Sequence, residues 1–274
     1  MATAAEKKQA YEQWKEHCKR VQSITDTALL AGETPAQKDR RILRLQGNYA
    51  AFCEYYFPHF LTLRDKTTGE VIRTIHNAPF HNAAAAKVKG TPNLKAVFMW
   101  PRGHAKSTHM DIFVPLWLMF QPKRLINFMV VVGKSEDSAT RLLGDIQAEL
   151  EHNQRIIADF GKQQGNASWQ DGEFKAANGV KFLACGRGQS PRGLRDREAR
   201  PDYIVIDDDV VRTCFPVSQT TWRLSASASQ EFHPVGRLEL PILPGGIPLL
   251  LAEVGNDALV MFQFCLNISQ QTCG

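Results

Sequence analysis

The sequence predicts an α/β fold in which a mainly parallel central sheet is flanked by helices and follows a helical N-terminal subdomain. Apolar segments at residues 96–100, 124–132 and 203–206 alternate with segments of helical periodicity, which is typical of α/β proteins. The segment 124–132 (RLINFMVVV) is too apolar to face solvent, as expected of a parallel strand that is buried on both faces. We divide the chain into a helical subdomain (residues 1–60), an α/β core (residues 61–212) and an atypical tail (residues 213–274).

Composition narrows the class of protein. A chain of 274 residues with 43% hydrophobic and 22% charged residues is typical of a soluble globular protein. The net charge is +5, and the tail contributes two arginines against four acids, so the first 212 residues carry 5 + 2 = +7. The six cysteines form no C-x-x-C pair, which predicts neither a zinc site nor a redox motif. We expect no signal peptide at the start and no membrane span, because no apolar run approaches about 18 residues.

Most of the first 90 residues are predicted to form helices. In residues 5–30 the apolar positions Tyr11, Trp14, Cys18 and Val21 fall on one helical face, and residues 39–56 form a second helical stretch. We interpret both as a subdomain that packs on the core. Next, Thr67-Thr68-Gly69 predicts a hairpin turn, and Asn77-Ala78-Pro79 introduces a helix over 80–88.

Histidines and aromatic residues in this region suggest two further roles. His76 and His81, with His59 nearby, can be imagined as a metal site, but a five-residue histidine spacing across a helix start has no strong precedent among metal sites. The alternative role is nucleotide contact. This segment carries aromatic residues just before residues 95–120, where they could contact the adenine ring of a bound nucleotide.

The central feature is residues 95–120, a strand (96–100), a tight turn and a helix that opens near Lys106 and Ser107. A lysine followed by a hydroxyl residue, where a strand turns into a helix, is typical of phosphate-binding loops. The pattern G-x-x-x-x-G-K-[ST] requires glycine at positions 100 and 105, where this chain has Trp100 and Ala105. The alternative is an ordinary strand–turn–helix with an exposed lysine.

Two further elements follow the strand at 124–132. Ser135 and Asp137-Ser138 open a helix that runs to about residue 152. Segments 168–176 and 179–186 predict a pair of antiparallel strands joined through Asn178-Gly179.

An arginine-rich loop and an acidic strand end complete the core. The loop over 186–200 holds five arginines, which are either a solvated charge run or a basic binding loop: Arg187, Arg192, Arg195, Arg197 and Arg200. The strand at 203–206 then ends in Asp207, Asp208 and Asp209. Three adjacent carboxylates at the end of a buried strand are costly unless a cation or hydrogen bonds receive them. Ligands bind at the carboxyl ends of strands in open α/β sheets, which is also where the turn after Trp100 is expected.

Together these motifs resemble the large terminase subunit of tailed bacteriophages, the ATPase that pumps DNA into the procapsid. The resemblance covers roughly residues 40–212 and rests on PRGHAKST, GQSPRGLR and YIVIDDD in that order. Terminase phosphate loops commonly depart from the glycine consensus and carry an arginine near their start, which Arg102 matches. The resemblance implies an ASCE-type P-loop ATPase fold, with ATP and Mg²⁺ as cofactors.

The resemblance also implies a role for each site residue. Lys106 holds the β- and γ-phosphates, Ser107 ligates Mg²⁺, and Asp207 holds the metal directly or through water. Arg102 offsets charge on the transferred phosphoryl group. The family usually has glutamate where this chain has Asp208, so either Asp208 or Asp209 orients the attacking water. Arg192 approaches the nucleotide or a neighbouring subunit. The nucleotide-binding residues are then Pro101, Gly103, His104, Ala105, Lys106, Ser107, Thr108 and Arg192.

The expected function is an ATP-hydrolysing motor domain that drives double-stranded DNA into the procapsid. The implied partners are the portal protein, the small terminase subunit and further copies of the chain in a homo-oligomeric ring, with no membrane contact. The implied place is the cytoplasm of the infected bacterial host, not the virion.

Residues 213–274 depart from the family. Their four scattered acids cannot build the family's nuclease site, so we expect no nuclease activity in this chain. We interpret the region as a frameshifted or disordered tail, or, with Cys214 as its first residue, as the start of a self-splicing element.

Two other functions remain open. One is a helicase-like P-loop ATPase, although no helicase motif follows residue 209. The other is a truncated, non-catalytic prophage remnant that binds nucleotide or DNA without turnover. DNA-stimulated ATP hydrolysis separates the motor from the remnant.

Overall fold

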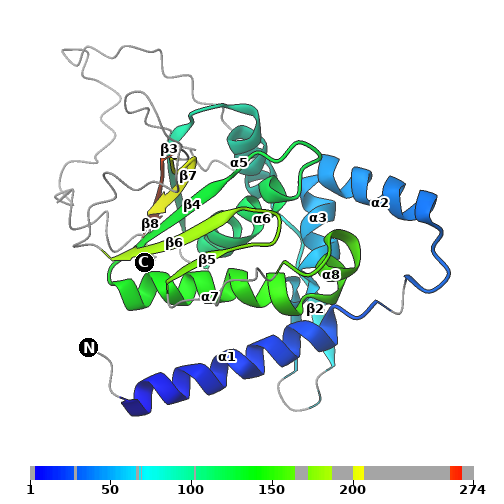
Figure 1. Cartoon of the computed structure of the whole chain (residues 1–274), viewed down its shortest axis with the longest axis horizontal. Coiled ribbons are helices and arrows are strands. Elements are labelled where there is room, and N and C mark those ends of the chain that lie inside the picture. The colour runs from blue at the N-terminus through cyan, green and yellow to red at the C-terminus, as the bar shows by residue number, and fades with distance from the viewer. Residues whose placement is uncertain are drawn as a thin grey trace, which may run out of the picture.

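The protein has a mixed α/β fold that is richer in helix than in strand (Figure 1). The computed structural model describes residues 4–27, 30–65, 68, 70–101, 103–163, 172–186, 200–206 and 260–266. Among these residues no helix combines the length and the apolar character needed to cross a membrane.

The central sheet has six strands. Their order is β3 (Lys95–Pro101), β8 (Val260–Leu266), β7 (Tyr203–Ile206), β4 (Phe128–Gly133), β6 (Lys181–Gly186) and β5 (Glu173–Lys175). Every neighbouring pair is parallel except β5–β6, which is the antiparallel hairpin predicted around Asn178-Gly179. The prediction of a mainly parallel sheet is therefore confirmed for the described strands.

Strand β8 comes from the region that we interpreted as a tail. Its backbone pairs with β3 along its whole length and with β7 from Val260 to Phe262. The composition change near residue 213 lies outside the described residues, and the frameshift interpretation stays a prediction.

One strand begins later than predicted. Residues 124–127 are not part of β4, and at Asn127 a side chain rather than a neighbouring strand accepts from the backbone N–H. The backbone N–H of Asn127 donates to the carboxylate of Asp202 (2.9 Å), and the Arg124 guanidinium donates to the Asn127 side chain (2.7 Å). The apolar stretch therefore becomes a strand only from Phe128.

The N-terminal region holds four helices, α1 (Ala4–Ile24), α2 (Pro35–Gly47), α3 (Tyr49–Tyr56) and α4 (Pro58–Leu61). The single helical stretch predicted over 39–56 is wrong, because Asn48 adopts an extended conformation (φ −129°) and caps α3 by accepting from the Ala51 N–H. On α1, Cys18 and Val21 are buried as predicted, but Tyr11 is 54% exposed.

The remaining elements follow in order along the chain. The predicted hairpin is β1 (Thr62–Arg64) with β2 (Val71–Thr74), and α5 (Pro79–Gly90) follows it. Helix α7 (Glu136–His152) begins after Ser135, whose hydroxyl accepts from the Ser138 N–H. A further helix that we did not predict, α8 (Gln154–Phe160), is capped by the Asn153 side chain.

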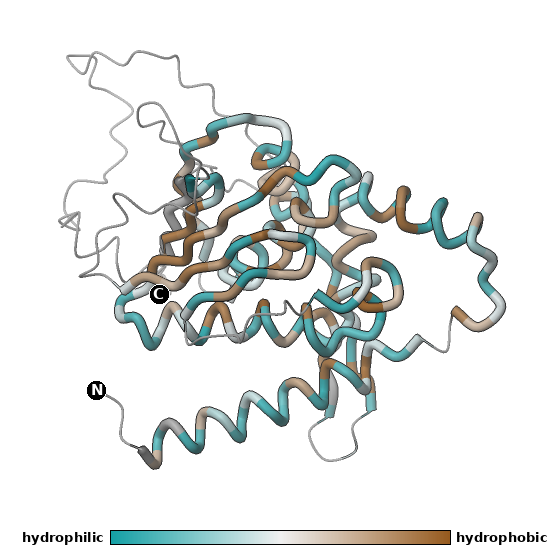
Figure 2. Tube along the Cα trace, in the orientation of Figure 1, coloured by the Kyte–Doolittle hydropathy of each residue, from teal (hydrophilic) through white to brown (hydrophobic). Residues whose placement is uncertain are grey.

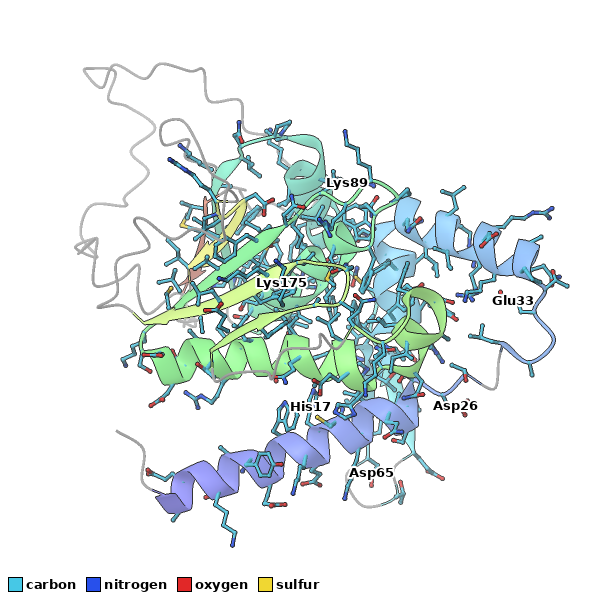
Figure 3. The ribbon with its side chains drawn as sticks, in the orientation of Figure 1. His17, Asp26, Glu33, Asp65, Lys89 and Lys175 are labelled. Carbon is cyan, nitrogen blue, oxygen red and sulfur yellow. The ribbon has the colours of Figure 1, made fainter. Side chains whose placement is uncertain are left out.

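Helix α2 is fixed to α8 by charge. The Arg41 guanidinium donates to both oxygens of Glu33 (2.7 Å each) and to both oxygens of Asp159 (2.5 and 2.9 Å). Figure 3 labels Glu33 in the segment that precedes α2. The hydroxyl of the buried Tyr56 also donates to Asp159 (2.7 Å), so α2, α3 and α8 share one polar network.

The main core lies on one face of the sheet. Residues of α3, α5, α7 and the helix after β3 pack there against Met129, Val131, Phe182, Tyr203 and Val205. The opposite face carries a smaller apolar cluster around Phe128, Val130 and Val132. Apolar residues on both faces explain why the strands stand out as continuous hydrophobic segments in Figure 2.

Candidate phosphate-binding site

The turn after β3 is built around backbone conformations that favour glycine. The His104 N–H donates to the Pro101 carbonyl (3.3 Å), and Gly103, the third residue of this turn, has φ 84°. A type II turn requires a positive φ at this position. Ala105 also has a positive φ, 52°, although it carries a Cβ atom. Position 105 is where the phosphate-loop consensus has glycine, and its backbone has the positive φ that glycine favours although the residue is alanine.

Packing explains why position 100 has tryptophan where the consensus has glycine. It is still part of β3, is 1% exposed, and packs edge-on against Phe80 with ring centroids 5.1 Å apart. The turn therefore begins after Trp100, and the indole belongs to the core beneath it.

Lys106 begins the helix that follows the turn. The His109 N–H donates to the Ala105 carbonyl (3.0 Å), which makes Lys106 the first helical residue and places the positive end of the helix dipole at the turn. Lys106 is 5% exposed, so the alternative of an exposed lysine is wrong. Ser107 and Thr108 are half-buried in the first helical turn.

Helix α5 holds the turn through His81, a role that the sequence did not reveal. The Nδ1 atom of His81 accepts from the Ala78 N–H (3.0 Å), so the ring proton must lie on Nε2, which donates to the His104 carbonyl (2.9 Å). Both bonds require a neutral imidazole. Burial lowers the pKa of His81, which favours that form.

His109 supports His81 from the helix. The two rings stack with centroids 3.8 Å apart, and His109 Nδ1 lies 2.7 Å from the hydroxyl of Tyr49. Burial, with a smaller effect of His81, lowers the pKa of His109 to about 3. The pair is therefore neutral at pH 7 and serves as packing beneath the turn.

The end of β7 lies at the same edge of the sheet as the turn, because β3, β8 and β7 are parallel. One strand separates β3 from β7, which corresponds to about 10 Å at the usual strand spacing. Val97 and Ile206 both pair with Phe262, so β3 continues four residues beyond the level at which β7 ends. Gly133 and Gly186, the last residues of β4 and β6, reach this edge too.

The structure thus gathers seven of the predicted nucleotide-binding residues in one turn and helix start: Pro101, Gly103, His104, Ala105, Lys106, Ser107 and Thr108. Five other predicted site residues lie outside the described residues, namely Arg102, Arg192, Asp207, Asp208 and Asp209. Sequence reasoning missed the role of His81 in holding the turn. The signal that could have found it is its position three residues after Ala78, where a side chain can bond back to the backbone at a helix start.

The three histidines weighed as metal ligands have separate partners. His59 bonds Glu149 (2.6 Å), His76 bonds Glu54 (2.7 Å), and His81 holds the turn. Within the described part of the chain, no group of three or more histidine, cysteine or acidic side chains is arranged to hold a metal ion.

Comparison with known proteins adds no relative. No protein-family model matches the chain, and no curated protein matches it significantly.

Proposed function

We propose that this chain is the ATP-hydrolysing motor domain of a phage terminase large subunit, with an ASCE-type P-loop fold. The observation that carries the proposal is the common edge of the sheet. A turn with two positive φ values leads there into a helix that starts at a buried lysine, and the strand before Asp207 ends at the same edge.

Each part has a physical role in holding a nucleotide. Backbone with positive φ turns N–H groups inward to form an anion-binding concavity, which the positive end of the helix dipole reinforces. Lys106 would pair with the β- and γ-phosphates, and Arg102 would offset charge on the phosphoryl group. Ser107 and Asp207 would hold Mg²⁺, which supplies charge neutralisation when it is bound. Asp208 or Asp209 would orient water, and Arg192 would contact the nucleotide or a neighbouring subunit.

The proposed setting follows the same family resemblance. The motor would act on double-stranded DNA as a homo-oligomeric ring on the portal protein, together with the small terminase subunit, in the cytoplasm of the infected bacterium. We expect no nuclease activity from the chain, and metal-dependent DNA cleavage by the pure protein would contradict this.

The first test is thermal unfolding of the full chain with and without Mg-ATP. Ligand at 100 times its dissociation constant should stabilise the protein by about 2.7 kcal/mol, which is several degrees for a chain of this size. Lys106→Ala should lose this shift, because the phosphates lose their cation. Lys123→Ala, which changes an exposed lysine ahead of β4, is the matched control and should keep the shift.

Turnover is tested separately by ATP hydrolysis with and without double-stranded DNA. The motor predicts hydrolysis that DNA stimulates and that Lys106→Ala abolishes. Binding without turnover would support the non-catalytic remnant, and hydrolysis that survives Lys106→Ala would remove the phosphate-loop assignment.

A further inference from the structure

The helix after the turn contains a widened segment. Residues Thr108–Phe113 form a π-helix, η2, which continues directly into α6 (Val114–Met119). The Val114 N–H donates to the His109 carbonyl, five residues back, where an α-helix would bond four residues back. Single π-turns inside α-helices are frequent at functional sites.

The widened turn leaves one carbonyl in need of a donor. In the same five-residue pattern, the Met110 carbonyl would accept from the N–H of residue 115, but residue 115 is proline and has no N–H. Met110 is fully buried, so water cannot reach its carbonyl to replace the missing donor. An unsatisfied buried carbonyl costs about 1–3 kcal/mol.

Tyr203 supplies the donor from the sheet. Its hydroxyl donates to the Met110 carbonyl (2.7 Å), and its ring is fully buried. Burial, with a smaller effect of Asp111, raises the pKa of Tyr203 well above its usual value, so the hydroxyl keeps its proton and remains a donor. Tyr203 is the first residue of β7, the strand that ends just before Asp207.

We propose that Tyr203 is a positioning residue that fixes the helix of the proposed phosphate-binding turn to β7, the strand that precedes the proposed magnesium-binding acids. Strands β3 and β7 share no ladder bonds because β8 lies between them, so the Tyr203 hydroxyl provides a direct bond from β7 to the helix that follows β3. Met110 lies about one helical turn after Lys106 and Ser107. The bond therefore sets how far Ser107 lies from the end of β7. This inference rests on the proposed function.

The test compares Tyr203→Phe with Tyr56→Phe in the full chain. Both remove one hydroxyl from a fully buried tyrosine that donates at 2.7 Å, and Tyr56 belongs to the α2–α3–α8 network. The readouts are the melting temperature without ligand and the dissociation constant of ATP with Mg²⁺ and with EDTA. We expect both variants to melt lower, but only Tyr203→Phe to weaken Mg²⁺-dependent binding, by about tenfold, with metal-free ATP affinity unchanged.

A second variant separates positioning from stability. Pro115→Ala gives the Met110 carbonyl a backbone donor, whether the segment stays π-helical or relaxes to α-helix. In the Tyr203→Phe background it should recover melting temperature but not Mg²⁺-dependent affinity. Recovery of both the melting temperature and the Mg²⁺-dependent affinity in the double variant would overturn the positioning role. An equal loss of Mg²⁺-dependent affinity in Tyr56→Phe would also overturn it. If the parent chain shows no ATP binding at all, the proposed function fails instead, and the melting temperatures still test the hydrogen bond itself.

Discussion

At the scale of single residues, Ala105 adopts a backbone conformation that favours glycine. Ala105 has φ 52°, a left-handed conformation that costs an L-residue with a side chain about 1–2 kcal/mol. Its side chain is exposed, so no packing contact explains the alanine. The surrounding turn, including the hydrogen bond from His81 to the His104 carbonyl, therefore holds Ala105 in this strained conformation.

Replacing Ala105 with glycine should therefore stabilise the protein. Glycine removes the conformational cost in the folded state, and the greater freedom of the unfolded chain offsets part of the gain, leaving about 0.5–1 kcal/mol. Urea unfolding would measure it as a higher midpoint. Ala51→Gly, inside helix α3, should lower the midpoint, and a lower midpoint for Ala105→Gly would contradict the strain.

The buried histidine pair predicts a loss of stability in acid. His109 has a folded-state pKa of about 3, below the ordinary value near 6.5, so the unfolded chain binds more protons between these limits. The contribution of neutral His109 to the free energy of unfolding is complete above pH 6.5 and is lost as the pH falls toward 3. Asp145, whose pKa burial raises to about 6, acts in the opposite direction.

The measurement that isolates His109 is the free energy of unfolding from pH 7.5 to 4.5 in the parent and in His109→Gln. The parent should lose up to about 1.4 kcal/mol per pH unit more than the variant below pH 6. Parallel curves would mean that His109 does not titrate differently in the two states.

At the scale of elements, two glycines allow α7 to approach the carboxyl edge of the sheet. A Cβ atom on Gly133 would lie 2.5 Å from the Ser138 hydroxyl and 2.8 Å from the Ala139 backbone nitrogen. A Cβ atom on Gly186 would lie 2.7 Å from the Glu136 nitrogen. The first turn of α7 thus rests on the ends of β4 and β6, and its dipole adds a second positive helix end at this edge.

Gly133→Ala should destabilise the chain by about 1–3 kcal/mol, because backbone atoms must move to admit the methyl group. Gly90→Ala is the matched control, since no atom lies within 4 Å of the Cβ position there. Thermal unfolding compares the two variants, and an equal effect would show that α7 has room to shift.

At the scale of the whole molecule, the sheet depends on β8. This strand is a neighbour of both β3 and β7, so its loss would leave the strands on the two sides of the candidate site without a shared partner. The apolar periodicity of a single strand cannot reveal such a long-range pairing, which is why sequence reasoning placed residues 213–274 outside the core.

Gln263→Pro tests this role of β8. Proline removes an N–H from a central strand and should cost about 1–3 kcal/mol for the ladder bond that is lost. Circular dichroism melting would detect it as a large fall in the transition temperature. An unchanged transition would favour a tail foreign to the fold. Resequencing codons 205–220 would then test the frameshift, which is contradicted if no alternative frame restores terminase-like sequence.

Local signals account for what the sequence predicted well. The strand, turn and helix around Lys106, the Ser135 cap and the Asn178-Gly179 turn each depend on residues close together in the chain. The missed features depend on distant contacts, such as the bond from Tyr203 to Met110, or on small interruptions such as Asn48. For the same reason, the pattern around Lys106 predicted the turn and the helix start, whereas the histidines that hold the turn required the fold.

The place of β8 also has a kinetic consequence. Residues 207–259 separate the end of β7 from β8, so the centre of the sheet stays incomplete until the ribosome has added the 60 residues from 207 to 266. At about 5–20 residues per second, this takes about 3–12 s. During that time two apolar strand edges lack their common neighbour, which makes the nascent chain a ready substrate for chaperones that recognise exposed strands.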